Sequence, residues 1–131
     1  MRMIITNIEY KNKRIYVIGN THIGNIKGEW CYKEIPILGT MYFFELNIGD
    51  VDKKEISVIS NEQFCPSVDF NDNRVKFKGR CEQIDDVYII LFSDDWIEML
   101  SIDNDDFSIK TGDAVSFSIN YDRVGIYPYF L

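Results

Sequence analysis

The chain has 131 residues, a mass of 15.4 kDa and a net charge of −7, which fit one domain spanning residues 1–131. Hydrophobic residues make up 46% and aromatic residues 15% of the sequence, a composition that excludes an intrinsically disordered chain. No run approaches the ~20 apolar residues of a membrane span, and the first residues lack the apolar region of a signal peptide. We therefore expect a cytoplasmic protein.

Alternating apolar and polar residues dominate the first half of the chain and predict strands. Met3–Tyr10 and Arg14–Ile18 are expected to form a hairpin around Lys11-Asn12-Lys13. Met41–Leu46 and Glu55–Ile59 are expected to form a second hairpin, with Gly49-Asp50 in its turn.

Two segments between these strands contain many turn-forming residues. Thr21–Gly39 contains Gly24, Gly28, Pro36 and Gly39, and Asn61–Asn73 contains Pro66 and several Asp and Asn. Both are predicted to be irregular connections.

The clearest strand signal is Arg74–Cys81, where every even position is cationic and the odd positions are apolar or small. Successive side chains on a strand point to opposite faces. One face should therefore meet the core. The other should carry a basic ridge, which consists of Arg74, Lys76, Lys78 and Arg80.

After this strand, Asp85-Asp86 predicts a turn and Val87–Phe92 a strand covered on both faces. Ser93 followed by two acids favours one short helix near residues 94–101, because serine caps helices well and acids suit the first turn. A strand over Trp96–Leu100 fits almost as well.

Ala114–Ile119 alternates again, and a turn at Asn120–Arg123 leads into Val124–Tyr127, which predicts a C-terminal hairpin. About 8–10 short strands separated by turns are typical of small β folds. The sequence therefore predicts an all-β protein, either a small barrel or a two-sheet sandwich.

The stretch Cys81–Ile109 contains nine acids and no Lys or Arg, and large apolar residues are interleaved among the acids. Such a segment should fold and present a negative surface that attracts cationic partners and repels polyanions. The residues expected to bind a partner are the acids and one aromatic side chain: Asp85, Asp86, Asp94, Asp95, Trp96, Glu98, Asp103, Asp105 and Asp106.

No Gly-rich phosphate loop, nucleophile elbow or dinucleotide fingerprint occurs, so we expect no enzyme activity and no cofactor. The leading hypothesis is a binding protein whose acidic face engages a basic protein. Its most concrete form is a bacterial immunity protein, or antidote, that neutralises a toxin such as a nuclease, since a nuclease must itself bind polyanions. We expect no membrane contact, and the negative field argues against nucleic acid.

Two alternatives remain open. The ridge Arg74, Lys76, Lys78 and Arg80 could bind nucleic acid or a small anion. The only histidine, His22, lies between glycines and could act as the general base of an enzyme.

Three cysteines, Cys31, Cys65 and Cys81, resemble neither a disulfide framework nor a zinc motif and should be free thiols. The acids from Asp103 onward do not form an EF-hand, because Ser108 and Ala114 occupy positions that need Gly and Glu. We therefore expect no metal site.

Overall fold

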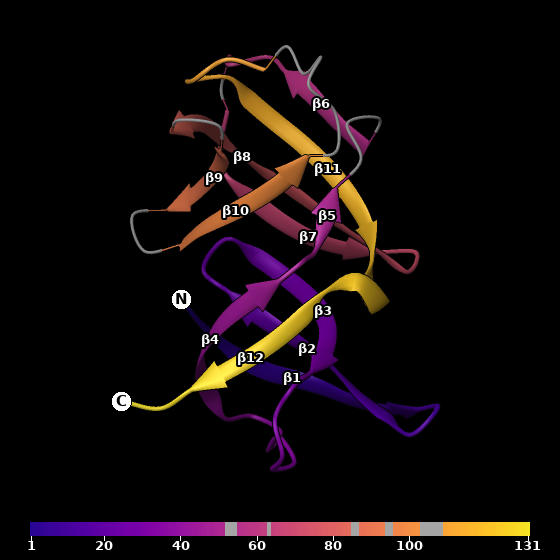
Figure 1. The fold of residues 1–131 in the computed structure, drawn as a ribbon. Helices are drawn as coiled ribbons and strands as arrows, with labels where there is room; N and C mark the ends of the chain where they lie inside the picture. Colours follow the sequence, from indigo (N-terminus) through magenta and orange to yellow (C-terminus); the bar gives the residue numbers. More distant parts are fainter. Residues whose placement is uncertain (52–54, 63, 85–86, 94–95, 103–108) are drawn as a thin grey trace.

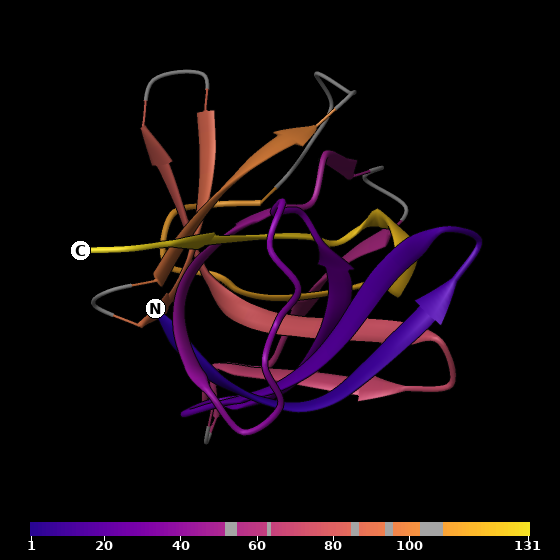
Figure 2. The same cartoon turned by 90° about the horizontal axis from the view of Figure 1, so that it is seen from below.

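The computed structural model describes residues 1–51, 55–62, 64–84, 87–93, 96–102 and 109–131, and gives only the backbone of residues 50, 83–84, 87–89, 91–93 and 96–102. Within these residues the chain is nearly all β, with a closed five-stranded barrel and a second sheet. Figure 1 shows the barrel below the second sheet, and Figure 2 shows the barrel from below as a ring. The expected all-β fold is confirmed.

The barrel has the strand order β1-β2-β3-β12-β4. Its strands are β1 (Arg2–Lys11), β2 (Arg14–Thr21), β3 (Gly24–Trp30), β4 (Met41–Asn47) and β12 (Gly125–Tyr129). The β1–β2 hairpin is confirmed. Asn12 and Lys13 in its turn both have positive φ, at 52° and 64°, which matches the twist of the flanking strands.

The second sheet has the order β5-β10-β9-β8-β11-β6, and β7 pairs with β8 beside β9. Its strands are β5 (Asp50–Val51), β6 (Ile56–Ile59), β7 (Ser67–Asn71), β8 (Arg74–Ile84), β9 (Val87–Ser93), β10 (Trp96–Ile102) and β11 (Ala114–Asn120). No helix in the described part of the chain is long and apolar enough to cross a bilayer.

One apolar core runs through both sheets. Phe44 is buried inside the barrel, and Phe77 stacks on Phe117 at 5.0 Å between ring centroids inside the second sheet. Phe77 and Val75 are fully buried, as the alternation of the Arg74–Cys81 strand predicts. Burying an aromatic ring of this size is among the largest single contributions to a core.

The expected helix near residues 94–101 is wrong, because β10 begins at Trp96 and pairs with β9. Pairing satisfies the backbone groups of this segment along the whole of β9, whereas the capping signal at Ser93 is purely local. Thr21–Gly39 and Asn61–Asn73 are also less irregular than predicted, since they contain β3 and β7.

The strands of two predicted hairpins form, but they do not pair with each other as predicted. β4 pairs with β1 and β12, whereas β6 pairs with β11. β12 does not fold back on β11 either. A 3-10 turn, Tyr121–Arg123, carries the chain from the second sheet into the barrel, where β12 lies between β3 and β4. Non-local pairing therefore decides the arrangement.

The barrel meets the second sheet where β3 passes β7. The Val68 N–H donates to the Ile23 carbonyl at 3.1 Å. Gly24 has a φ of +136°, and a Cβ there would lie 1.8 Å from the Val68 carbonyl oxygen. Only glycine allows this approach of the two backbones.

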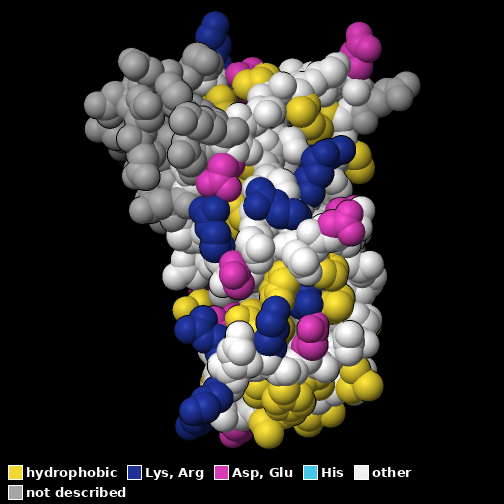
Figure 3. Space-filling model, turned by 90° about the vertical axis from the view of Figure 1, so that its right-hand side faces the viewer, with side chains coloured by type: hydrophobic (Ala, Val, Ile, Leu, Met, Phe, Trp, Pro, Cys, Tyr) yellow, Lys and Arg dark blue, Asp and Glu magenta, His cyan; other side chains and the backbone are white. Residues whose placement is uncertain are grey.

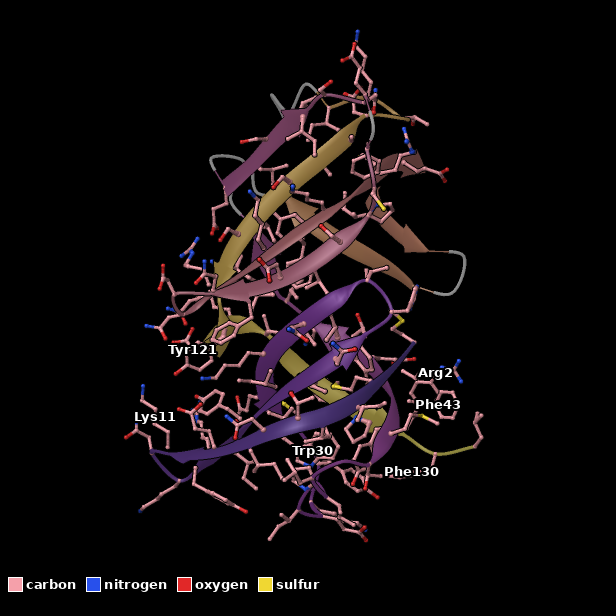
Figure 4. The ribbon with its side chains drawn as sticks, turned by 180° about the vertical axis from the view of Figure 1, so that it is seen from behind. Arg2, Lys11, Trp30, Phe43, Tyr121 and Phe130 are labelled. Atoms are coloured by element: carbon pink, nitrogen blue, oxygen red, sulfur yellow. The ribbon has the colours of Figure 1, made fainter. Side chains whose placement is uncertain are left out.

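A buried cation lies at the same junction. Lys27 of β3 is 5% exposed, and its Nζ lies 2.6 Å from the Glu9 carboxylate. The same ammonium lies 4.0 Å from the ring centroid of Tyr121 and 5.2 Å from that of Phe70. Figure 4 shows Tyr121 between the barrel and the second sheet. These contacts join residues of β1, β3, β7 and the 3-10 turn.

Candidate functional site

Most of the residues expected to bind a basic partner fall outside the described part of the chain. These are Asp85, Asp86, Asp94, Asp95, Asp103, Asp105 and Asp106. Trp96 and Glu98 belong to β10, of which the backbone alone is described. The acidic face therefore stays a prediction at the level of its side chains.

The described strands show which strand ends are neighbours in this part of the sheet. Tyr88 of β9 lies opposite Gln83 of β8 on one side and opposite Leu100 of β10 on the other. The last residues of β8 and of β10 therefore flank the start of β9. Residues 85–86 and 103–108, which come next in the sequence after β8 and β10, lie outside the described residues.

At the other end of this strand pair, Ser93 of β9 lies opposite Trp96 of β10. Seven residues of extended strand span roughly 20 Å at about 3.3 Å per residue. Asp50 of β5, which the sequence assigned to a turn, pairs with Ser101 near the end of β10 and adds another acidic position there. Of the nine acids, only Glu82 and Glu98 belong to described strands, where Glu82 pairs with Ile89 and Glu98 with Ile90.

The basic ridge on β8 forms as predicted. Arg74, Lys76 and Arg80 are exposed and Lys78 is half-buried, whereas Phe77 and the other inward residues are buried. The neighbouring strands place Ser67 of β7 and Ser116 of β11 directly opposite Lys78. Lys78 therefore lies between two serines, of which Ser67 is half-buried and Ser116 is buried.

The two ends of the ridge are held by hydrogen bonds. Arg74 donates to the Ser118 hydroxyl at 3.2 Å and to its carbonyl. Arg80 donates to the Gly112 carbonyl at 2.9 Å, and its guanidinium lies 5.1 Å from the ring centroid of Phe64. Among the described residues, no ridge cation forms an ion pair with a carboxylate.

The structure brings His22 and Lys78 into one pocket of about 590 Å³, although 56 positions separate them in the sequence. The walls come from the β2–β3 turn, the end of β6 and the connection from β6 to β7. The lining residues are His22, Ile23, Ile59, Ser60, Glu62, Phe64, Cys65, Pro66, Ser67 and Lys78. His22 and Lys78, which the sequence suggests for two different functions, therefore line the same pocket.

Local hydrogen bonds position the histidine turn of this pocket. The Thr21 hydroxyl donates to the Gly24 carbonyl at 2.8 Å and accepts from the Ile23 N–H at 3.2 Å. The Ile23 carbonyl in turn accepts from Val68, so the turn is attached to β7. His22 is thus presented on a turn fixed at both ends, with its side chain exposed.

The pocket combines groups with different chemistry. Lys78 supplies an ammonium, His22 an imidazole and Ser67 a hydroxyl, whereas Phe64 and Pro66 supply an apolar wall. Within the described residues His22 forms no hydrogen bond to a side chain that could be its nucleophile or its acid. The arrangement can bind an anion beside a flat apolar group.

The sequence points to His22 and Lys78 as candidate site residues, but not to the rest of the pocket. Phe64, Cys65 and Ser67 belong to a segment for which it predicts only an irregular connection. Its Phe-Cys-Pro-Ser run, which combines apolar and hydroxyl side chains within a loop, was the available signal.

All three cysteines are free thiols, as predicted. Cys65 is exposed, Cys31 is half-buried and Cys81 is buried. Burial raises the pKa of the Cys31 thiol, and burial with the neighbouring carboxylates of Asp113 and Glu82 raises the pKa of Cys81 to about 11. In the described ranges, no three His, Cys, Asp or Glu side chains cluster as metal ligands.

An apolar surface covers the end of the barrel that faces away from the second sheet (Figure 3). Ile35, Ile37 and Leu38 are each more than 60% exposed in the loop before β4. Phe130 is 61% exposed although its ring centroid lies 5.4 Å from that of Tyr32. Figure 4 shows Phe130 near Trp30 and Phe43 at this end. Exposed apolar groups of this size commonly mark contact surfaces.

Comparisons of this chain with protein families, with curated proteins and with solved structures gave no match.

Proposed function

We propose that the chain is a non-enzymatic binding protein that engages a basic macromolecule through the acidic end of the β8–β10 sheet. The observation that supports this is the register in which Tyr88 has Gln83 on one side and Leu100 on the other. The ends of β8 and β10 are thereby neighbours, and we expect the acids that follow them in the sequence to add their fields there.

The finer form of the proposal is an immunity protein or antidote that covers the cationic site of a toxin such as a nuclease. An enzyme that binds polyanions carries a positive surface, so a compact acidic protein is electrostatically complementary to it. Charge complementarity of this kind mainly raises the association rate, which suits a protein that must capture a toxin before it acts.

Three matched triple variants test the proposal, and each raises the net charge by the same amount. The first is Asp85→Asn with Asp86→Asn and Asp105→Asn, at the proposed binding end. The second is Asp94→Asn with Asp95→Asn and Glu98→Gln, which changes two residues between β9 and β10 in the sequence and one residue of β10. The third is Asp69→Asn with Asp72→Asn and Asp122→Asn, three exposed acids elsewhere.

Proteins retained from a lysate of the source cells by the immobilised wild type are identified, and association rates are then measured at several ionic strengths. We expect a basic partner, and we expect the first triple to slow association by about tenfold or more and to flatten the salt dependence. The third triple should change the rate much less. Equal slowing by all three triples would mean that net charge alone matters, and the proposed face would be abandoned.

A further inference from the structure

We propose that the pocket between the β2–β3 turn and the β6–β7 connection binds a nucleoside monophosphate, a ligand that combines one phosphate with a flat ring. None of the acids proposed to bind a basic partner lines this pocket, and the inference does not depend on that proposal. Its volume of about 590 Å³ lies within the range of roughly 300–1,000 Å³ that small-molecule sites occupy.

The phosphate group would bind at Lys78 and the polar groups around it. Lys78 is half-buried, lines the pocket and lies opposite Ser67 in the pairing of β7 with β8. His22 reaches the same pocket from the attached turn and can donate an N–H in either protonation state. The ammonium and the hydroxyl lie on neighbouring strands and the imidazole on the turn, and all three can donate hydrogen bonds to phosphate oxygens.

The flat ring of the ligand would pack against the apolar wall of the pocket. Phe64 and Pro66 belong to the connection before β7, and Ile23 and Ile59 line the pocket with them. The Arg80 guanidinium lies over the Phe64 ring at 5.1 Å from its centroid and holds it beside the pocket. Stacking of a base on an aromatic side chain contributes roughly 1–3 kcal/mol and tolerates every base.

Glu62 is the one carboxylate among the lining residues, and it narrows the ligand class. A carboxylate accepts hydrogen bonds from ribose hydroxyls, which favours a nucleoside over a bare aromatic phosphate. Its charge also repels additional phosphates, because like charges close together disfavour each other. The pocket should therefore prefer a monophosphate to a triphosphate.

Calorimetric titration of the full chain tests this inference with inorganic phosphate, uridine, adenosine, and their monophosphates and triphosphates. We expect a monophosphate to bind more tightly than its nucleoside, its triphosphate or inorganic phosphate. Lys78→Gln should weaken that binding by about tenfold or more, since it removes a hydrogen bond to a charged group. Phe64→Ala should weaken it by about fivefold or more through lost stacking.

Lys76→Gln is the matched control, because Lys76 is the next cation on the same ridge and does not line the pocket. It should change the affinity by less than about twofold, and unchanged melting temperatures should show that the variants fold. No heat of binding from any of these ligands at millimolar concentration would overturn the proposal, as would equal losses for Lys76→Gln and Lys78→Gln. Tighter binding of a single-stranded oligonucleotide, weakened equally by substitutions of Arg74, Lys76, Lys78 and Arg80, would assign the ridge to a polyanion instead.

Discussion

The barrel and the second sheet are built from similar strands, but the strand pairing of the barrel closes into a ring and that of the second sheet stays open. Each barrel strand has a neighbour on both sides, so the described backbone closes on itself. In the second sheet, β6 pairs only with β11 and β5 reaches β10 over two residues, within the described ranges. Closed barrels have no edges, whereas open sheets keep edges and hollows available for binding.

Charge follows a related division. Residues 1–38, which include β1 to β3, carry six Lys or Arg and three Asp or Glu, whereas residues 39–131 carry eight and eighteen. The basic ridge, most of the proposed nucleotide pocket and the acidic segments all belong to the second sheet and its connections. The comparison indicates that the barrel has mainly a structural role, whereas the open sheet and its connections carry most of the candidate binding residues.

The largest effect is expected from truncating a core aromatic residue, in the second sheet or in the barrel. Phe77→Ala should destabilise the protein by about 3–5 kcal/mol, because it leaves a cavity beside Phe117 in the second sheet. Phe44→Ala is the corresponding change in the barrel. Denaturant unfolding followed by intrinsic fluorescence and circular dichroism should give one shared transition in both variants.

Lys76→Ala is the surface control for this experiment and should stay within about 0.5 kcal/mol. Two separate transitions, of which each variant shifts only one, would show that the barrel and the sheet unfold independently. A Phe77→Ala effect as small as that of Lys76→Ala would contradict the register of β8.

A substitution at the junction between barrel and sheet should lower the free energy of unfolding nearly as much as Phe77→Ala. Gly24→Ala should cost about 2–4 kcal/mol, since it combines an unfavourable φ with a clash against the Val68 carbonyl. Gly39→Ala is the control, because Gly39 also has positive φ, at +80°, but a Cβ there meets nothing within 4 Å. It should cost only about 1–2 kcal/mol. Equal melting temperatures for the two variants would rule out the close approach.

The buried cation provides a smaller effect at the same junction. Glu9→Gln should destabilise by about 1–2 kcal/mol, a value reduced because the Glu9 side chain is 46% exposed. Lys27→Met should cost less, since it removes the buried charge together with its need for a partner. Thermal unfolding of both variants checks the order. A larger loss for Lys27→Met would mean that the contacts of the ammonium with Tyr121 and Phe70 stabilise the junction on balance.

The smallest effect at neutral pH concerns Cys81. Its folded-state pKa of about 11 exceeds the ordinary value of 9.0, so the folded state holds the thiol proton more tightly than the unfolded state. This contribution to stability is complete below pH 9 and is lost as the pH rises toward 11. Cys81→Ala should therefore flatten the fall in stability over this interval, as measured by denaturant unfolding at each pH.

Cys65→Ala is the control and should leave that slope unchanged, because Cys65 is exposed. In the native protein at pH 8, a thiol reagent should label Cys65 first and Cys81 last. Labelling of Cys81 at the rate of Cys65 would contradict its burial.

The parts of the fold that were predicted correctly depend on neighbours in the sequence. The Arg74–Cys81 register and the first hairpin follow from period-two alternation and from turn residues, which act locally. β3 was missed because Gly24 and Gly28 resemble breakers. In the structure they are places where another backbone passes, and a Cβ on Gly28 would lie 2.6 Å from the Val124 carbonyl oxygen. That partner is almost a hundred positions away.

The candidate pocket could not be predicted from the sequence for the same reason. His22 and Lys78 were each singled out for their own chemistry, but only the attachment of the β2–β3 turn to β7 brings them together. Pairing of β10 with β9 likewise overrode a helix signal at Ser93 that was locally reasonable. Contacts between distant segments decide such outcomes, and a single sequence contains no record of them.

The position of β12 has a consequence for synthesis of the chain. β12 contains residues 125–129, yet it lies between β3 and β4, two strands made from the first 47 residues. The nascent barrel strands must therefore wait, with an unpaired edge, until residues 125–129 have emerged from the ribosome. At about 5–20 residues per second this delay lasts several seconds, during which the open edge needs protection from other chains.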